Sequence, residues 1–260
     1  MGAGPTPALT GRRAGFGIDI GGSGMKAAIV DLDTGALLSE RQRIPTPQPA
    51  TPTAMADVVR ALSGRLEWDD ALGAAFPAIV RHGVVELAAN IDASWIGVDA
   101  RRVFTDACGH PVALVNDADA AGIAEVRLGA GRGREGVVLM LTFGTGIGSG
   151  LFVDGVLVPN TELGHVELDG QDAELLASAS AREREGLGWA EWAPRVERYL
   201  RHLEMLFSPD LFVVGGGASK VADAWLPLVD IDTEIVPAQL ANNAGIVGAA
   251  LIGAGLDSPG

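Results

Sequence analysis

The chain has 260 residues, 48 % of them hydrophobic, with 36 glycines and a formal net charge of −14. This length can bury a sizeable core in one large domain or two smaller ones, and the acidic charge argues against duplex nucleic acid as a partner. The single cysteine, Cys108, excludes an internal disulfide framework and a multi-cysteine zinc site, and no apolar run reaches the ~18 residues of a membrane span.

The first half of the chain predicts three strands followed by alternating helices and strands. Turn-forming residues at 21–24 and 31–35 separate the first three strands, which is typical of an antiparallel meander. Four prolines between residues 45 and 52 exclude regular structure there. The expected strands cover residues 16–20, 25–30, 36–44, 71–76 and 112–115, and the expected helices cover residues 53–66 and 119–128.

The second half of the chain repeats this plan. Its expected strands cover residues 136–142, 149–153, 156–158 and 211–214, and its expected helices cover residues 173–184, 189–207 and 243–255. Two meanders in tandem, each followed by α/β units, predict two similar lobes with a cleft between them, a usual place for ligands. We therefore expect an α/β fold with a small lobe of residues 14–117, completed by a closing helix at 243–256, and a larger lobe of residues 118–242.

The first candidate site is the sequence Asp-Ile-Gly-Gly-Ser-Gly-Met-Lys at residues 19–26. Its three glycines let backbone N–H groups approach phosphate oxygens closely, which makes an anion-binding concavity. Ser23 can add a hydroxyl group and Lys26 a positive charge. An ordinary glycine-rich hairpin explains the same residues, and the spacing is not that of a P-loop.

The second candidate site is the sequence Thr-Phe-Gly-Thr-Gly-Ile-Gly at residues 142–148, again at a turn between two strands. One such turn is weak support for a phosphate site. Two of them, at matching places in the two halves, predict a pair of turns that enclose a phosphate chain.

A third candidate is Asn116–Asp117, which follows an apolar strand. A carboxylate in that place projects into a cleft rather than a core, so Asp117 can accept the proton of an attacking hydroxyl group. A structural alternative stays open, because Asp117 or Asp119 can cap the helix that follows.

The fourth candidate is the segment Asn-Thr-Glu-Leu-Gly-His at residues 160–165. Glu162 and His165 are three residues apart, so one turn can aim both at a small ligand, although a lone histidine can equally be structural. Carboxylate, amide and imidazole groups suit sugar hydroxyls, which both donate and accept hydrogen bonds. Asn90 offers another amide in a polar loop.

Together these segments resemble the ROK family of sugar kinases and repressors over residues 16–256, and most of all its actinobacterial polyphosphate glucokinases. The similarity is carried by the segments 19–26, 116–122, 141–149 and 162–170. It implies a two-lobed actin-like (ribonuclease H-like) ATPase fold, in which each lobe is a mixed sheet with helices and the second lobe carries the sugar site and a dimer surface.

The resemblance also implies an activity and the roles of individual residues. Glucose is phosphorylated at its 6-hydroxyl by polyphosphate, ATP or both, with Mg²⁺, which gives glucose 6-phosphate. Asp117 is the catalytic base, and Asp19 holds Mg²⁺, through water. The implied sugar-binding residues are Asn90, Asn116, Asp117, Glu162, His165 and Glu174. The implied donor-binding residues are Asp19, Gly21, Gly22, Ser23, Gly24, Lys26, Thr142, Gly144, Thr145, Gly146, Gly215, Gly216 and Gly217.

The chain departs from the family pattern in two places. Most family members carry a cysteine-rich zinc segment where this chain has residues 166–173 without a cysteine, so we expect no zinc, as in the polyphosphate-using branch. The repressors carry a DNA-binding helix-turn-helix, whereas only about 15 residues precede the first expected strand here. We expect a cytoplasmic enzyme without nucleic-acid or membrane partners, and the resemblance implies a homodimer.

The phosphoryl donor and the sugar stay open at this point. The alternatives are an ATP-only glucokinase, a kinase of another hexose such as mannose or an N-acetyl sugar, and a non-enzymatic sugar-sensing regulator. Polyphosphate needs a locally positive track. The candidate basic residues are those of the segment 129–134, Arg182, Arg184 and Lys220, each of which is equally compatible with a solvated surface.

Overall fold

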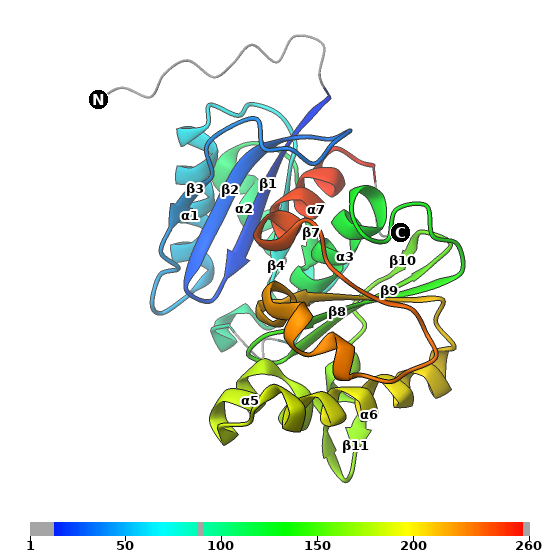
Figure 1. The fold of residues 1–260 in the computed structure, drawn as a ribbon. Coiled ribbons are helices and arrows are strands. Elements are labelled where there is room, and N and C mark those ends of the chain that lie inside the picture. Colours follow the sequence, from blue (N-terminus) through cyan, green and yellow to red (C-terminus); the bar gives the residue numbers. More distant parts are fainter. Residues whose placement is uncertain (1–12, 88–90, 257–260) are drawn as a thin grey trace. The chain divides into compact units, whose positions relative to one another are not determined.

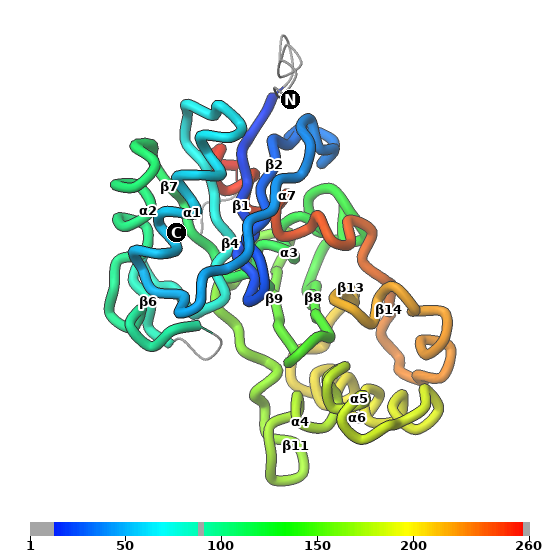
Figure 2. The backbone as a smooth tube through the Cα atoms, turned by 90° about the vertical axis from the view of Figure 1, so that its left-hand side faces the viewer, coloured from blue at the N-terminus to red at the C-terminus, as the bar shows by residue number. Residues whose placement is uncertain are grey.

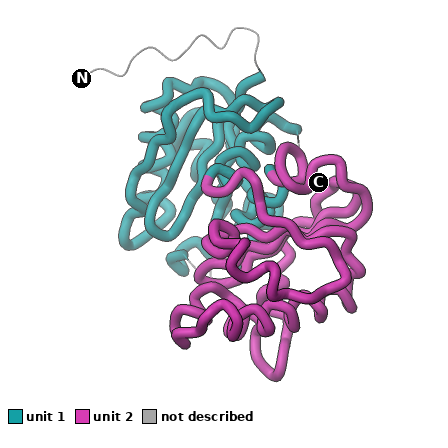
Figure 3. The backbone as a smooth tube through the Cα atoms, viewed as in Figure 1, with its two compact units in different colours: residues 1–124, 243–260 teal, residues 125–242 magenta. Residues whose placement is uncertain are grey.

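The computed structural model describes residues 13–87 and 91–256. The chain divides into two compact units, unit 1 with residues 1–124 and 243–260, and unit 2 with residues 125–242 (Figure 3). The boundary expected after residue 117 coincides with the start of helix α3 (Asp117–Leu128), whereas the division between the units falls inside this helix.

Unit 1 is built on a five-stranded sheet with the order β3-β2-β1-β4-β7. β1, β2 and β3 are antiparallel neighbours, and β4 and β7 run parallel to β1. The strands are β1 (Ala14–Gly21), β2 (Gly24–Asp31), β3 (Gln42–Ile44), β4 (Leu72–Phe76) and β7 (Val112–Asn116). A small hairpin of β5 (Ile79–Arg81) and β6 (Val84–Leu87) and the 3₁₀ turn η1 (Ala93–Trp95) follow β4.

The third expected strand, over residues 36–44, is wrong in its length. Only residues 42–44 form β3, and Leu37 makes an isolated bridge to Val30. The hydroxyl group of Ser39 accepts the backbone N–H of Ile29 at 2.9 Å. In a regular strand pair this N–H group would donate to a backbone carbonyl instead. Because the Ser39 side chain accepts it, the strand is interrupted there.

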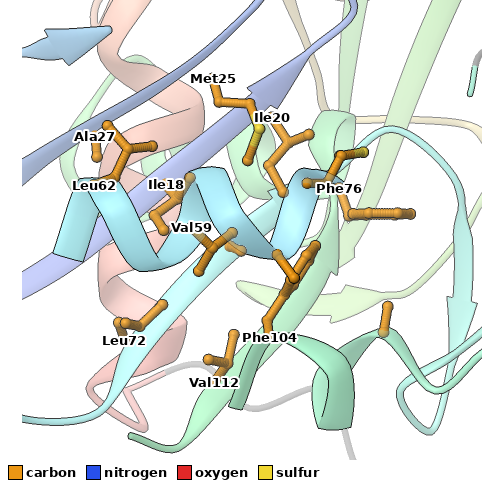
Figure 4. Close-up of a cluster of buried hydrophobic side chains, with 14 of the residues drawn as sticks. Ile18, Ile20, Met25, Ala27, Val59, Leu62, Leu72, Phe76, Phe104 and Val112 are labelled. Carbon is orange, nitrogen blue, oxygen red and sulfur yellow. The ribbon is translucent and has the colours of Figure 1, made fainter. Parts of the chain in front are cut away.

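Helices cover both faces of this sheet (Figures 1 and 2). Helix α1 (Pro52–Arg65) packs on the face that carries Ile18 and Ile20, in a hydrophobic cluster with helix α2 (Ala100–Cys108) (Figure 4). Helix α7 (Ala244–Gly253) lies against the other face of β1 and β4.

Two glycines allow α7 to lie this close to the sheet. A Cβ atom on Gly17 would be 1.9 Å from the carbonyl oxygen of Ile246. One on Gly73 would be 1.8 Å from that of Ala249. Any larger residue at either position would push the helix away from the sheet.

Helix α2 was not anticipated from the sequence. The side chain of Asp99 caps its first turn by accepting the N–H of Arg102, and Gly109 ends it in the left-handed conformation. An Asp at the start and a Gly just past the end are recognisable helix signals, so the helix was predictable from its caps.

Unit 2 repeats the sheet of unit 1 with the order β10-β9-β8-β13-β14. β8, β9 and β10 form an antiparallel meander, and β13 and β14 are parallel to β8. The prediction of two meanders, each followed by α/β units, is confirmed. The strands are β8 (Val137–Phe143), β9 (Ile147–Val153), β10 (Val156–Val158), β13 (Leu211–Gly216) and β14 (Ile235–Pro237).

The helices of unit 2 pack on the sheet around Trp192, Tyr199 and Trp225, which are fully buried. The expected helix over residues 173–184 is divided at Ser178, which is extended and caps the second piece by accepting the N–H of Ala181. The helices are α4 (Ala173–Ala177), α5 (Ala179–Glu185) and α6 (Trp189–Phe207). Short elements are β11 (Glu167–Leu168), β12 (Gln171–Asp172), η2 (Leu163–His165), η3 (Gly217–Ala224), η4 (Leu226–Leu228) and, in the connection to α7, η5 (Ala241–Asn243).

Across residues 13–87 and 91–256, the helices all fall short of the length and apolar character that a bilayer span requires.

Candidate active site

The carboxyl ends of β1, β4 and β7 meet at one edge of the sheet of unit 1. The parallel register pairs Asp19 with Ala75 and Phe76 with Asn116. Asp19, Pro77 and Asp117 therefore emerge at the same edge. In open α/β sheets this edge is the usual place for ligands.

Asn116 holds the start of helix α3. Its side-chain oxygen accepts the N–H groups of Ala118 at 2.8 Å and Asp119 at 3.2 Å, and its amide group donates to the carbonyl of Ala78 at 3.3 Å. Asn116 is buried, whereas Asp117 is exposed. The side-chain oxygen of Asn116 thus caps the helix, a role expected for Asp117 or Asp119, while Asp117 also accepts the N–H of Ala118.

Asp117 stands in the first turn of this helix with an accessible carboxylate. Its Oδ1 accepts the N–H of Ala118 at 2.9 Å, which orients the side chain. An oriented, exposed carboxylate at the carboxyl end of a strand has the geometry that a general base requires.

The β1–β2 turn carries a charged pair next to its glycines. Asp19 and Lys26 are direct cross-strand partners, and Nζ of Lys26 is 3.0 Å from Oδ2 of Asp19. Asp19 also lies against the first turn of α7, because a Cβ atom on Gly245 would be 3.1 Å from its carboxyl carbon. A helix N-terminus favours a negative charge there. Gly22 and Ser23, at the tip of the turn, are exposed.

A pocket of about 410 Å³ adjoins this turn within unit 1. Its walls combine backbone of the turn with polar and apolar side chains. They are formed by Ile20, Gly21, Gly22, Thr46, Gln48, Pro49, Ala50, Met55, Pro77, Ile91 and Asp92. Of the described residues, Ile91 and Asp92 are the first after Asn90, which itself lies outside the described residues. The amide, hydroxyl and carboxylate groups of this pocket suit a ligand rich in hydroxyls.

The two predicted donor-binding turns of unit 2 lie side by side. The parallel register of β8 and β13 pairs Thr142 with Gly215 and Phe143 with Gly216. Thr145 and Gly217 are exposed at this edge. The residues of unit 2 that were expected to bind the donor, Thr142, Gly144, Thr145, Gly146, Gly215, Gly216 and Gly217, are therefore neighbours at one sheet edge.

Helices α4 and α5 hold the β8–β9 turn. Oε2 of Glu174 accepts the N–H of Ile147 at 3.0 Å, and the N–H of Ser180 donates to the carbonyl of Gly144 at 3.0 Å. A Cβ atom on Gly146 would be 2.3 Å from Oε2 of Glu174. Glu174, expected to contact the sugar, thus also fixes the turn expected to contact the donor.

The segment with Glu162 and His165 is fixed to strand β9. The hydroxyl group of Ser149 donates to the carbonyl of Thr161 at 2.7 Å and accepts the N–H of Leu163 at 2.9 Å. A Cβ atom on Gly164 would be 2.2 Å from the backbone oxygen of Ile147, so only glycine fits at position 164.

Four acidic or basic groups influence one another around this segment. Partial burial raises the pKa of Glu162; the positive charge of His165 opposes that rise, and the negative charge of Glu174 adds to it. The hydrogen bond from Nδ1 of His165 to Oδ2 of Asp172, at 2.9 Å, raises the pKa of His165. Unit 2 therefore places Glu162, His165 and Glu174 close enough for their charges to influence one another.

Asp172, which contacts His165, was not among the site residues expected from the sequence. It reaches His165 because the β11–β12 hairpin turns through Asp169 and Gly170, both with positive φ. The adjacent Asp169–Gly170 pair is a hairpin signal, and it could have indicated that Asp172 returns towards His165.

Most of the basic residues proposed as a polyphosphate track serve other contacts. Arg134 pairs with Glu234 at 2.7 Å, and Arg184 pairs with Glu185 at 3.2 Å. Arg182 lies over the ring of Trp189, with its guanidinium carbon 3.9 Å from the ring centre. Ion pairs and a cation–π contact occupy these groups, so they are weak candidates for a track.

Comparison with known proteins decides the family. The ROK family model matches residues 15–178, which include the β1–β2 turn, Asp117, the β8–β9 turn and His165. This protein belongs to the ROK family. The predicted resemblance is confirmed, and with it the actin-like fold.

Two ROK relatives that use a named sugar and donor are close in sequence. The polyphosphate glucokinase of Mycobacterium tuberculosis (strain CDC 1551 / Oshkosh) is 50 % identical over 247 residues, which cover 95 % of this chain and 93 % of that protein. The inorganic polyphosphate/ATP-glucomannokinase from Arthrobacter sp. strain KM is 56 % identical, with a TM-score of 0.86 over 93 % of this chain and 98 % of that one.

A more distant member of the ROK family has the same fold. The glucokinase from Streptomyces griseus, solved in complex with glucose and AMPPNP, is 27 % identical, with a TM-score of 0.77 over 92 % of this chain and 99 % of that one. The fold is thus retained where the sequence has diverged widely.

Proposed function

We propose that this protein is a kinase that phosphorylates glucose at the 6-hydroxyl, with polyphosphate or ATP as the donor, and releases glucose 6-phosphate. The observation that carries the proposal is the exposed carboxylate of Asp117 beside the buried Asn116, at the same sheet edge as the glycine-rich β1–β2 turn. The similarity to the mycobacterial and Arthrobacter kinases supports glucose as the acceptor and polyphosphate as a donor.

In the proposed reaction Asp117 accepts the proton of the sugar 6-hydroxyl while that oxygen attacks the terminal phosphorus of the donor. The new bond joins the sugar oxygen to phosphorus, and the bond from phosphorus to the bridging oxygen breaks. The leaving group is ADP or a polyphosphate shortened by one unit.

The proposed sugar contacts are Asn90, Asn116, Asp117, Glu162, His165 and Glu174. Glu162 and Glu174 accept hydrogen bonds from sugar hydroxyl groups. Nδ1 of His165 is bonded to Asp172, so His165 donates to the sugar through Nε2. The proposed donor contacts are backbone N–H groups of the two glycine-rich turns and of Gly215, Gly216 and Gly217, together with Ser23, Lys26 and Thr145. Preorganised N–H groups stabilise developing charge without reorganisation.

Asp19 fits a role as a Mg²⁺ ligand. The ion usually takes one or two carboxylates and completes its shell with water and substrate phosphates. Among the described residues, no cluster of three His, Cys, Asp or Glu side chains could hold a metal without such help. Asp19 would hold Mg²⁺ jointly with donor phosphate oxygens and water, and the ion would neutralise phosphate charge.

The family resemblance also carries the proposal of a homodimer. On helix α6, Met205 and Leu206 are 70 % and 49 % exposed, and burying such side chains is favourable. These residues are the proposed contribution of unit 2 to that interface.

A donor-by-acceptor assay tests the proposed activity. Purified protein with Mg²⁺ is supplied with polyphosphate or ATP, and with glucose, mannose or an N-acetyl sugar; mannose is included because the Arthrobacter relative is a glucomannokinase. We expect glucose 6-phosphate with at least one donor. The absence of turnover with every pair would favour a sugar-sensing regulator, and turnover with ATP alone would remove polyphosphate from the proposal.

Replacing Asp117 tests the base. Asp117→Asn retains the size of the side chain and removes its basicity, so kcat falls by about 10²-fold or more while glucose still binds. Asp119→Asn, at the neighbouring buried carboxylate, is the control for effects on helix α3. Near-normal turnover of the Asp117 variant would contradict the assignment.

A further inference from the structure

Three basic side chains lie in a row that leads from the β1–β2 turn to the edge strand β3 of the unit 1 sheet. Lys26 on β2 and Arg43 on β3 are direct cross-strand partners, as Lys26 is with Asp19 on β1. Cross-strand partners point to the same face of a sheet. Arg41, two residues before Arg43, continues this row just outside β3.

Contacts fix the two arginines around the turn. Arg43 donates to the carbonyl of Ser23 at 2.9 Å, and a Cβ atom on Gly24 would be 2.6 Å from its Nε. The guanidinium group therefore lies on the backbone of the turn itself. Arg41 donates to the side-chain oxygen of Asn243 at 3.3 Å, next to the start of α7.

Among residues 13–87 and 91–256, no carboxylate neutralises the charge of these two arginines. In the described part of the chain, neither Arg41 nor Arg43 forms an ion pair, and both are exposed. Many other arginines are paired with carboxylates, namely Arg13, Arg60, Arg81, Arg102, Arg134, Arg184, Arg195, Arg198 and Arg201.

The row of Asp19, Lys26, Arg43 and Arg41 carries three cations and one carboxylate, on a chain with a net charge of −14. The N-terminus of α7 adds a partial positive charge at the end of the row where Arg41 lies. Local cations and oriented N–H groups can bind polyanions even on an acidic protein, because binding depends on the electrostatic potential near the site rather than on the net charge.

We propose that Lys26, Arg43 and Arg41 form a track for a linear polyphosphate, in which the phosphates beyond the transferred one run from the β1–β2 turn towards the N-terminus of α7. The inference rests on the proposed function and specifies its donor. Arg43, on the turn, is close to the phosphates that every donor has in common. Arg41 is further along the row, so only a donor with a long chain of phosphates reaches it.

The distinction between Arg41 and Arg43 gives the test. Arg41→Gln raises KM for long-chain polyphosphate about three- to tenfold and leaves KM for ATP within about twofold. The double variant Arg41→Gln/Arg43→Gln raises KM for polyphosphate further. In both variants, KM for polyphosphate becomes less sensitive to salt, because fewer cations contribute to binding.

Arg65→Gln is the matched control, since Arg65 is an exposed arginine in the last turn of α1, which packs on the opposite face of the sheet. Equal effects of the Arg65 and Arg41 variants would mean a general charge effect and would overturn the track. An unchanged KM for polyphosphate in the double variant would overturn it as well.

Direct titration with polyphosphate separates this inference from the proposed function. If the wild-type protein phosphorylates glucose with ATP but not with polyphosphate, the proposed donor is wrong. Binding of polyphosphate measured by calorimetry then decides the track alone. Weaker binding to the double variant than to the Arg65 variant supports it, and no binding, or equal binding, overturns it.

Discussion

The β1–β2 turn and the β8–β9 turn occupy the same place in two sheets with the same strand order, yet different groups hold them. The turn of unit 1 is surrounded by charge, with Asp19, Lys26 and Arg43 on the neighbouring strands. The turn of unit 2 is held by hydrogen bonds from helices, through Glu174 and Ser180. A repeated fold thus supplies two glycine-rich turns, and the residues around each turn decide its chemistry.

This difference predicts that the two turns contribute to donor binding in different ways. Cations next to a turn attract the negative charge of a phosphate directly. A turn that is held by hydrogen bonds from helices instead offers its backbone N–H groups in fixed positions. Substitutions in the first turn are therefore expected to change donor binding alone. Substitutions in the second turn are expected to change both the fold of the turn and the activity.

The largest effects are expected from a pair of glycine substitutions, one in each turn. A Cβ atom on Gly146 displaces Glu174 and its bond to Ile147, so Gly146→Ala lowers stability by about 1–3 kcal/mol and kcat/KM at least tenfold. A Cβ atom on Gly22 meets nothing within 4 Å. Gly22→Ala leaves stability within about 0.5 kcal/mol and raises only the donor KM.

Chemical denaturation and initial-rate kinetics on both variants are the measurements. Equal losses of stability in the two variants would mean that the two turns are held alike. An unchanged donor KM in Gly22→Ala would remove that turn from the proposed donor contacts.

A smaller effect is expected from Glu174→Gln. The amide can still accept the N–H of Ile147, but the negative charge is lost, and that charge raises the pKa of Glu162. The pKa of Glu162 therefore falls in the variant, which a carboxyl-carbon NMR titration measures. Glu167→Gln, at an exposed carboxylate of β11, is the control. No change in the pKa of Glu162 would show that the two carboxylates act independently.

The smallest effect concerns pH and the pair of His165 and Asp172. The pKa of His165 is raised in the folded protein, so the stabilisation from the pair is complete below the unfolded value of about 6.5 and is lost as pH rises through the folded value. The side chains are 44 % and 49 % exposed, which limits the contribution to about 0.5 kcal/mol.

Asp172→Asn removes the acceptor charge, so the pKa of His165 falls and the variant has a lower Tm than the wild type at pH 5 but not at pH 8. Imidazole NMR titration and thermal melts at the two pH values measure this. A Tm difference that persists unchanged at pH 8 would assign the effect to packing rather than to charge.

The sequence predicted those features that depend on neighbouring residues along the chain. Alternating apolar residues and turn residues indicated the two meanders, and the residues of helix α6 were predicted from end to end. The division at Ser178 was not predicted, because helical spacing continues across it while the backbone is extended. Helix α2 was missed although its caps are visible in the sequence.

The sequence indicated where the candidate site residues stand along the chain but not which contacts they make. Both glycine-rich turns and Asp117 were found from local patterns. The bond from Ile147 to Glu174, the pair of His165 and Asp172, and the position of Arg43 on the turn depend on how separate elements pack. Such contacts follow from tertiary structure, and no local pattern in the chain specifies them.

The close packing of α7 on Gly17 and Gly73 has a consequence for biosynthesis. Unit 2 is continuous in sequence, whereas unit 1 needs residues 244–253 to cover one face of its sheet. During translation the strands of unit 1 leave the ribosome first, and the helix that completes them leaves after all of unit 2. The half of the molecule that is made first can therefore complete its packing only after all of unit 2 has been made.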